Sequence, residues 1–312
     1  MIRYIGWRLL QIVPVLFGVS VIAFLLLRLI PGDPAVTILG DRATPQLVAR
    51  LHREMGLDAP IWVQYLNFLG RAIHGDFGTS FIYRTQVFAV TMARIPLSLL
   101  LISYAALMAL AIAIPLATIA ALKRGRLIDQ AIRLLFTTTL GIPSFWLAIM
   151  LILLLGVGLK LFPVGGQGDG GLDTLWHLTL PAFTIGLAMS PILVRSLRSS
   201  LIEVLGADYV TTGKAMGLSG LGFTWSYLLR NSILPVILVL SIHVGWLLSG
   251  TVIVEQIFGL PGVGSLLISS ISTRDYAFIQ LVALLFAMMV ILVNLATDLL
   301  YAALDPRVSL RR

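Results

Sequence analysis

The sequence predicts an all-α polytopic membrane protein with six transmembrane helices and a compact helical element in one cytoplasmic loop. Three observations support this class. Of the 312 residues, 58% are hydrophobic and 12% are charged, whereas a soluble domain carries about 25% charged residues. The mean hydropathy is +0.99. The apolar residues also gather in runs of about 20, which is the length that crosses the hydrocarbon of a bilayer.

Six segments are long and apolar enough to be predicted as spans. They are Leu9–Ile30, Leu97–Leu122, Leu134–Phe162, Leu178–Val194, Ile233–Ile257 and Ile279–Leu304. The first follows Arg3 and Arg8 and is not followed by a small-residue cleavage site, so we expect an uncleaved span rather than a signal peptide. Pro181 and Pro191 interrupt the fourth span. A membrane helix tolerates proline when neighbouring helices satisfy the freed carbonyl groups.

The basic residues of the short connections predict the orientation of the spans. They precede the first span, lie between the second and third and between the fourth and fifth, and end the chain: Arg3, Arg8, Lys123, Arg124, Arg126, Arg133, Arg195, Arg198, Lys214, Arg230, Arg307, Arg311 and Arg312. The short connections on the other side carry only Arg274. Short basic loops stay in the cytoplasm, so both termini are predicted to be cytoplasmic. This assigns the net charge of +8 to membrane orientation, and nucleic acid is not expected as a partner.

The predicted spans divide the chain into four parts. Residues 1–30 form the first transmembrane helix, 31–96 an external loop, 97–304 a core of five transmembrane helices and 305–312 a cytoplasmic tail. Within the core, residues 198–232 form a cytoplasmic loop.

Two short amphipathic helices are predicted in the external loop. In ATPQLVARLHREMG, we expect Thr44 as the N-cap, Pro45 as the first helical residue and Gly56 as the C-terminal stop. In LDAPIWVQYLNFLGRAIHG, apolar residues that include Trp62 and Leu66 recur on one helical face. Three roles stay open for these helices: they rest on the lipid interface, cap the bundle or meet an external partner.

The cytoplasmic loop contains the stretch DYVTTGKAMGLSG, in which Gly213 and Lys214 give a partial likeness to a phosphate-binding loop. Such a loop needs a glycine where Asp208 stands and a hydroxyl residue where Ala215 stands, so no nucleotide site is predicted. The stretch instead predicts a short helix. Asp208 would accept hydrogen bonds from the first free N–H groups, and Gly217 would permit a left-handed exit.

A second helix is predicted in the following segment, LSGLGFTWSYLLRNSILP. We expect Ser219 to cap it and Trp225, Leu228 and Leu229 to share one face, with Pro235 near the start of the fifth span. The two helices exceed what a connector needs, because bundle helices are commonly joined by about 2–8 residues.

This loop resembles the cytoplasmic loop of the permease subunits of ATP-binding-cassette importers, in the branch that imports dipeptides, oligopeptides, glutathione or nickel. In that family the loop carries Glu-Ala-Ala, three residues and Gly, and later a hydrophobic residue and Leu-Pro. It forms a coupling helix that docks into a groove of the ATPase subunit. Gly217, Leu234 and Pro235 match this pattern, whereas the TTG of residues 211–213 stands where Glu-Ala-Ala is expected.

The resemblance extends over nearly the whole chain. Seven further segments look like family segments in family order: RLLQIVPVLFGVSVIAFLLLRLIPGDP, MGLDAPIWVQY, HGDFGTS, GIPSFWLAIML, EQIFGLPGVGSLL, RDYAFIQ and LYAALDPR. The long outer loop is similar to that of the first of the two permeases in such systems. The resemblance implies a type I importer permease fold and a translocation pathway for di- or oligopeptides. Nickel, a metallophore or glutathione is the alternative cargo on the same architecture.

The resemblance also implies partners and site residues. The partners are a second homologous permease subunit, two ATPase subunits that bind ATP and Mg²⁺, an extracytoplasmic substrate-binding protein and membrane lipid, all at a prokaryotic inner membrane. This chain itself is expected to hold no cofactor and no metal and not to be an enzyme. The residues implied in coupling to the ATPase are Asp208, Tyr209, Thr211, Thr212, Gly213, Ala215, Gly217, Leu218 and Pro235.

Ionisable residues inside predicted spans indicate candidate positions along a translocation path or gate, because charges are costly in the bilayer. His243 lies in the fifth span, Glu255 near its outer end and Asp298 in the sixth. For His243 and Asp298 the alternative is interhelical hydrogen bonding. For Glu255 the alternative is to hold the outer gate or the loop in place.

Small residues predict close helix approach. Ala105, Ala109 and Ala113 recur at four-residue spacing, which lets helix backbones approach in lipid. The pattern fits packing within the chain and packing against a second subunit equally.

Two other classes of protein are weighed and not favoured. A secondary transporter would show an internal repeat or broken helices around a central ionisable site. An intramembrane enzyme would need a nucleophile–base pair or a metal motif. The chain has no cysteine, and its four histidines, His52, His74, His177 and His243, do not fall at the three- or four-residue spacing of helical metal ligands.

Overall fold

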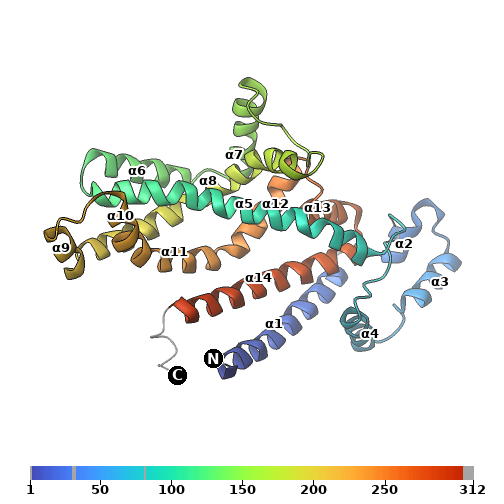
Figure 1. Cartoon of the computed structure of the whole chain (residues 1–312). Helices are drawn as coiled ribbons and strands as arrows, with labels where there is room; N and C mark the ends of the chain where they lie inside the picture. Colours follow the sequence, from blue (N-terminus) through green and yellow to red (C-terminus); the bar gives the residue numbers. More distant parts are fainter. Residues whose placement is uncertain (1, 30–32, 81, 305–312) are drawn as a thin grey trace. The chain divides into compact units, whose positions relative to one another are not determined.

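The computed structural model describes residues 2–29, 33–80 and 82–304. Over these ranges the regular elements are helical, and the only strand-like pairing is one isolated antiparallel bridge between Thr79 and Gln86. The predicted all-α class is therefore confirmed. The chain forms two compact units, one of Met1–Pro96 with Ser265–Leu292 and one of Leu97–Gly264 with Val293–Arg312. Figure 1 shows the helices of both.

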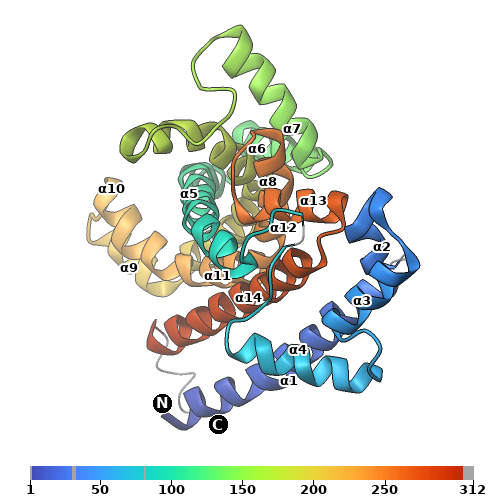
Figure 2. The same cartoon turned by 90° about the vertical axis from the view of Figure 1, so that its right-hand side faces the viewer.

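The first unit holds the N-terminal helices and one C-terminal segment. Its elements are α1 (Ile2–Leu29), α2 (Pro34–Leu39), the short 3₁₀ turn η1 (Gly40–Arg42), α3 (Pro45–Met55), α4 (Ile61–Ile73), most of α13 (Val263–Thr273) and the first part of α14 (Tyr276–Leu304). Helices α1 and α4 lie side by side (Figure 2). Tyr65 of α4 joins them, since its hydroxyl lies 2.8 Å from that of Ser20 and its ring packs edge-on against Phe24.

The predicted helix in the external loop forms with the expected ends. The Thr44 hydroxyl accepts a hydrogen bond from the Leu47 N–H at 3.4 Å, Pro45 begins α3, and Gly56 ends it in the left-handed conformation with φ of 66°. The predicted second helix is α4, and its Trp62 and Leu66 side chains are exposed.

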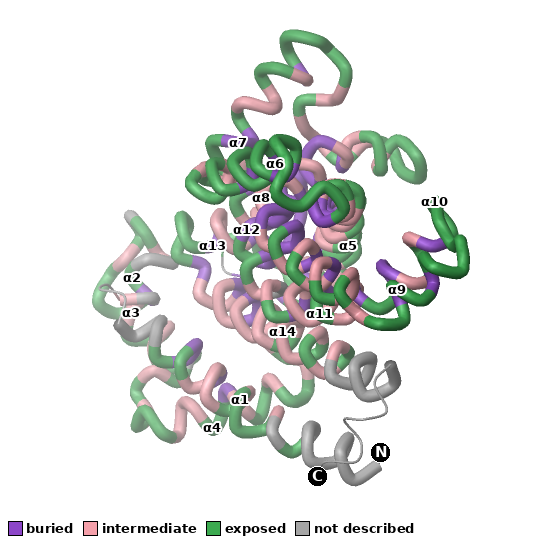
Figure 3. Tube along the Cα trace, turned by 90° about the vertical axis from the view of Figure 1, so that its left-hand side faces the viewer, coloured by how far each residue is buried: buried purple, intermediate pink, exposed green. Residues whose placement is uncertain are grey.

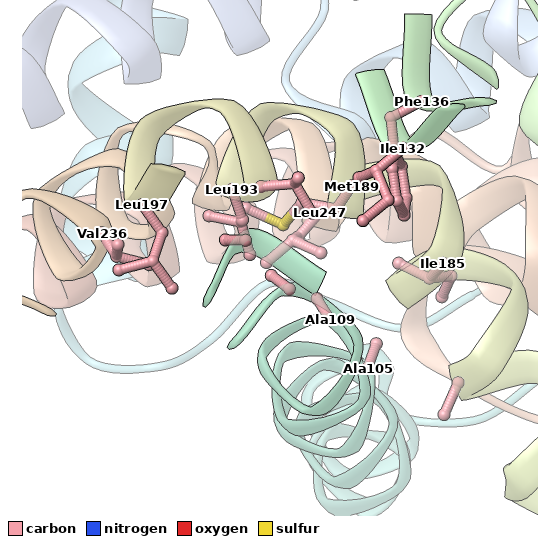
Figure 4. Close-up of a cluster of buried hydrophobic side chains, with 14 of the residues drawn as sticks. Ala105, Ala109, Ile132, Phe136, Ile185, Met189, Leu193, Leu197, Val236 and Leu247 are labelled. Carbon is pink, nitrogen blue, oxygen red and sulfur yellow. The ribbon is translucent and has the colours of Figure 1, made fainter. Parts of the chain in front are cut away.

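The second unit is built around α8. Its elements are α5 (Val87–Leu122) from Leu97 on, α6 (Leu127–Thr139), α7 (Ser144–Leu151), the π-helical η2 (Ile152–Gly158), α8 (Gly171–Leu205), α9 (Asp208–Ala215), α10 (Gly220–Phe223), the π-helical η3 (Thr224–Leu229), α11 (Arg230–Ile242), α12 (Val244–Ile257) and the end of α14. Buried side chains of α8 recur every four residues at Ile185, Met189, Leu193 and Leu197. They form the cluster in Figure 4 with residues of α5, α6, α11 and α12.

The alanine stripe of α5 packs within the chain. Ala105, Ala109 and Ala113 are fully buried. A Cβ placed on Gly186 of α8 would lie 2.9 Å from the Ala105 carbonyl oxygen and 3.0 Å from the Ala109 nitrogen. The two backbones therefore touch where glycine meets alanine, and of the two interpretations of this stripe the structure supports the intrachain one.

Each predicted span falls on helices of the structure, except at residues 140–143 and at His243, which lie between helices, at Leu159–Phe162, which lie beyond η2, and at Ile30, which lies outside the described residues. Among the described residues, four helices are long and apolar enough to cross a membrane, and a fifth span results if one bent pair is counted as one.

That bent pair corrects the third predicted span. The segment expected as one helix from Leu134 to Phe162 is interrupted, and α6 and the helix formed by α7 and η2 meet at 105°. Gly141 and Pro143 lie at the break, and Pro143 is the N-cap of α7. Proline disfavours helical backbone at the preceding residue, which ends α6 here.

The fifth predicted span is corrected at its start and in its middle. It begins earlier, because α10, η3 and α11 run as one helical rod from Gly220 to Ile242. It is also interrupted at His243, which lies between α11 and α12 with φ of −90° and ψ of 7°. Pro235 accordingly lies inside α11 rather than near the start of the span.

Candidate functional site

The candidate site is the element formed by α9 and the turn that follows it, at the C-terminal end of α8. The α9 helix ends at Ala215, and Gly217 adopts φ of 81°. The Leu218 N–H donates to the Gly213 carbonyl and the Gly217 N–H to the Lys214 carbonyl, both at 3.0 Å. This pair of bonds is the Schellman motif, which satisfies the free carbonyls of a helix end and strongly favours glycine. The predicted left-handed exit at Gly217 is confirmed.

The predicted role of Asp208 as N-cap is wrong. Ala207 is the capping residue and makes no side-chain hydrogen bond, while Asp208 is the first residue of α9. A carboxylate in the first turn is still favourable, because it faces the positive end of the helix dipole. Lys214 in the last turn complements the negative end in the same way.

One face of α9 is fixed against the helix that follows. Val210 and Gly213, three residues apart, are buried. A Cβ on Gly213 would lie 3.1 Å from the Phe223 ring and 3.6 Å from the Tyr227 ring, and these two rings stack with their centroids 5.0 Å apart. Glycine at 213 therefore allows α9 to lie directly on an aromatic pair, which holds the helix as a rigid body.

The other face of this element is apolar and exposed. Figure 3 shows α9 and α10 coloured mostly as exposed, in contrast to the buried stretches of α8. The exposed large side chains are Tyr209, Met216, Leu218, Leu221 and Trp225. We call these five residues the α9–α10 apolar face. Leu221 is 90% exposed and Trp225 is 67% exposed. These exposed apolar side chains near the end of the helical bundle make this element the candidate interaction site.

Sequence reasoning missed part of this face. It assigned Trp225 to one face with Leu228 and Leu229, but these two leucines are buried while Trp225 points outward. The reason is η3, since a π-helical segment advances more residues per turn than an α-helix and so rotates the side chains that follow. Met216 and Leu221 were not singled out, although their place beside the turn glycines was the available signal.

Ser219 is the N-cap of α10, but its side chain makes no capping hydrogen bond. Thr211, Thr212 and Ala215 are exposed on α9, and Pro235 is exposed on α11. The structure thus brings the predicted coupling residues together on one element, except Pro235, which is 12 residues beyond Phe223 along the rod, or about 18 Å at the α-helical rise.

The three predicted path or gate residues lie in different settings. His243 is half-buried at the break between α11 and α12, where its Nδ1 donates to the Val239 carbonyl at 2.8 Å. Asp298 belongs to α14, and its side chain lies outside the described residues. Glu255 is buried near the end of α12.

Glu255 holds the loop that follows α12. Its carboxylate accepts hydrogen bonds from the Ser98 hydroxyl at 2.6 Å and from the Gly264 N–H at 2.8 Å. The Ser98 hydroxyl in turn accepts from the Val263 N–H at 2.9 Å. A Cβ on Gly262 would overlap the Glu255 carboxylate. This geometry fits the interpretation in which Glu255 holds the loop after α12 in place.

Metal-ligand geometry is not found in the described part of the chain, where no group of three or more His, Asp or Glu side chains converges. A mixed apolar and cationic cavity does occur between α6 and α8, lined by residues of both helices.

The fold and this element together define a class: a polytopic membrane protein whose helical core carries a rigid, outward-facing apolar element at one end. Family comparison then places the chain. Residues 113–310 match the family described as the binding-protein-dependent transport system inner membrane component, and residues 1–102 match the N-terminal family of the same membrane components. The chain therefore belongs to the binding-protein-dependent inner membrane transport permeases.

Full-length relatives agree with this family. The chain is 37% identical to the dipeptide transport system permease protein DppB of Escherichia coli K12, over 99% of each chain. It is 36% identical to the oligopeptide transport system permease protein AppB of Bacillus subtilis 168, over 99% of this chain and 100% of the relative. It is also 36% identical to the glutathione transport system permease protein GsiC of Salmonella choleraesuis, over 99% of each.

A solved structure shares the fold. A chain of the MetNI methionine ABC transporter, in an inward-facing conformation, superposes with a TM-score of 0.58 at 15% identity. The similarity covers 69% of this chain and 96% of that one. It supports the type I permease fold.

Proposed function

We propose that this chain is the translocation subunit of an ATP-driven importer for di- or oligopeptides. Separate ATPase subunits bind ATP and Mg²⁺, and the chain itself is not an enzyme. An extracytoplasmic binding protein delivers the cargo, and a second, homologous permease completes the pathway within the lipid bilayer. Membership of the binding-protein-dependent permeases and the peptide permeases among the full-length relatives support this proposal.

The α9–α10 apolar face is the observation that carries the mechanism. A permease without its own motor receives work through a contact, and that contact transmits displacement only if it is stiff. The Schellman turn at Gly217 and the packing of Gly213 on Phe223 supply the stiffness. The exposed side chains of Tyr209, Leu221 and Trp225 supply an aromatic and aliphatic anchor of the kind that dominates protein interfaces.

The rest of α9 fits a partner surface. Thr211, Thr212 and Ala215 are exposed small or hydroxylated side chains, so a groove can approach the helix closely. Movement of two such elements, one on each permease, would rock the helical cores between outward- and inward-open states. The orientation predicted from the basic loops, with both termini in the cytoplasm, places this element on the side of ATP.

The first test is co-purification with the ATPase subunits. Gly217→Val forces a β-branched residue into a left-handed conformation and should abolish both the association and the transport-stimulated ATPase activity. Gly206→Val is the control. Gly206 is the C-cap of α8, just before α9, and its φ of −87° is open to any residue. A Cβ at this position would make only ordinary contacts. Full assembly and transport by Gly217→Val would refute the coupling role.

The second test separates the contact from the fold. Leu221→Ala and Trp225→Ala remove exposed side chains, so the permease should keep its thermal stability while its affinity for the ATPase falls about tenfold or more. Leu172→Ala is the matched control, because Leu172 is 83% exposed but lies at the other end of α8. Unchanged affinity in both the Leu221→Ala and the Trp225→Ala variant would exclude this face as the contact.

Glutathione is the second candidate cargo, since a glutathione permease is similar over its full length. Uptake of labelled dipeptide, glutathione and Ni²⁺ by the whole complex in liposomes would rank the three. Peptide uptake that saturates, with no competition from glutathione or Ni²⁺, is the expected result.

A further inference from the structure

The cavity between α6 and α8 has no part in the coupling described above. It has a volume of about 580 Å³. Each helix presents the same spacing to it: α6 contributes residues 130, 133, 134 and 137, and α8 contributes 191, 194, 195 and 198. Positions i, i+3, i+4 and i+7 form one helical face. The cavity is therefore a groove between two matched helix faces, with Phe136 as a further apolar wall.

The polar half of the groove is cationic. Arg133, Arg195 and Arg198 line it, and one buried carboxylate, Asp129, lies beside them. That carboxylate is engaged by Arg198 through two hydrogen bonds of 2.7 Å and is 3.8 Å from Arg133. Within the described part of the chain, Arg195 makes no ion pair with a carboxylate. The groove thus keeps an excess of positive charge.

The charged and apolar residues of the groove are separated along both helices. On α6, Arg133 precedes the apolar Leu134 and Phe136, although the span predicted from Leu134 is broken after Thr139. On α8, Arg195 immediately follows Val194, the last residue of the fourth predicted span. With the membrane boundary predicted on α8, we expect the arginines at the level of lipid headgroups and the apolar lining at the level of acyl chains.

The depth along α8 agrees with this placement. Arg198 precedes the end of α8 at Leu205 by seven residues, or about 10 Å of helix. The α9 element follows that end directly, on the side predicted to be cytoplasmic. Basic pockets between membrane helices on the cytoplasmic side bind acidic lipid headgroups.

We infer that this groove binds an anionic glycerophospholipid of the inner leaflet. Its phosphate lies against Arg133 and Arg195, and one acyl chain lies along Leu134 and Val194. A peptide carboxylate or a free phosphate ion shares the anionic chemistry but has no use for the apolar half of the groove. The inference needs the chain to span a membrane in the orientation predicted from its basic loops, and it is independent of the proposed cargo and motor.

The test uses the full-length chain in detergent, titrated with phosphatidylglycerol and followed by native mass spectrometry. Retained phosphatidylglycerol should exceed retained phosphatidylcholine, and affinity should fall about fivefold for each arginine removed in Arg133→Gln and Arg195→Gln. Arg198 is left unchanged, because its removal would leave the buried carboxylate of Asp129 without its ion-pair partner. Arg124→Gln is the control, since Arg124 lies in the same basic region but does not line the groove.

Competition distinguishes the sources of the anion. Inorganic phosphate and a dipeptide, each in millimolar excess, should leave the lipid bound if both halves of the groove contribute. Equal retention of the two lipids, no effect of the double arginine variant, or displacement by dipeptide at concentrations that drive transport would each overturn the inference. Because no ATPase subunit is present, failure of the coupling proposal does not alter this readout.

Discussion

Arg198 of α8 donates from Nε and Nη2 to the two carboxylate oxygens of Asp129 on α6, with both distances 2.7 Å. Asp129 is 1% exposed and Arg198 is 19% exposed. The Gly125 N–H donates to the same carboxylate at 2.9 Å. One side chain therefore ties together the turn before α6, the start of α6 and the last third of α8.

Loss of this carboxylate should destabilise the second unit. Asp129→Asn leaves the Arg198 charge without its partner and should cost about 2–4 kcal/mol, measured by chemical denaturation in detergent. Arg133→Gln, whose nearest contact with Asp129 is 3.8 Å, should cost less than about 1 kcal/mol. Replacement of Asp129 and Arg198 together by leucine should cost less than the sum of the single changes, because no charge is then stranded. An additive result would show that the pair acts as two independent residues.

The loop after α12 depends on a glycine that makes room for Glu255. Gly262→Ala places a methyl group against the buried carboxylate and should destabilise the protein by about 1–3 kcal/mol. Gly250→Ala in α12 is the control, because nothing lies within 4 Å of its added Cβ. It should be neutral or stabilise the helix by about 0.5–1 kcal/mol. Equal melting temperatures for the two variants would show that the loop adapts freely.

The N-terminal unit should lose stability in acid through Asp33. This carboxylate accepts hydrogen bonds from His52 and from the Ala35 N–H at 2.8 and 2.9 Å. The hydrogen bond from His52, followed by the Ala35 N–H, lowers the pKa of Asp33 below its ordinary value of 3.8 despite opposing desolvation. The stabilisation is therefore complete above pH 3.8 and is lost as the pH falls through the lowered pKa.

Asp33→Asn tests this dependence. The stability difference between wild type and Asp33→Asn should be largest near neutral pH and should shrink below pH 3.8, as followed by thermal unfolding in detergent. Glu54→Gln, an exposed carboxylate paired with Arg50 four residues earlier, should show a smaller difference. A difference that stays constant from pH 7 to pH 3 would contradict the assignment.

The predicted orientation can be read directly because the natural chain has no cysteine. Leu221→Cys should react with a membrane-impermeant maleimide only from the cytoplasmic side, and Leu172→Cys only from the outside. Both positions are exposed leucines at opposite ends of α8 or its continuation. Labelling of Leu172→Cys from the cytoplasm would reverse the topology derived from the basic loops.

The features of the fold that were predicted correctly from the sequence are those determined by residues close together in the chain. Thr44, Gly56 and Gly217 act through hydrogen bonds and backbone angles within a few residues, so their positions alone predicted helix ends. The apolar run lengths placed the spans for the same reason. The bend near Pro143 also had a local signal, which was the proline itself. The apolar run continues through the bend, so hydropathy alone predicts a single span there.

The parts that did not follow depend on tertiary packing. Trp225 points outward because the π-helical segment η3 rotates the side chains relative to an α-helix, and the neighbouring residues give no sequence signal for a π-helical segment. Glu255 and Ser98 are 157 residues apart, and only the fold brings them together. The pairing of Asp129 with Arg198 is likewise a product of the α6–α8 contact. The position of a charged residue near a predicted span does not indicate which residue it forms an ion pair with.

The rod from Gly220 to Ile242 has a mechanical consequence. Its 23 residues extend about 35 Å at the helical rise, and its first eight residues include Phe223 and Tyr227, the aromatic pair on which α9 lies. If the ATPase contacts α9 as proposed, a lever of that length converts a tilt of about 5° at the α9 end into a swing of about 3 Å at the far end. The joint at His243 is where such a swing would be taken up, so α12 and the loop beyond it can stay in place while the inner half of the pathway opens.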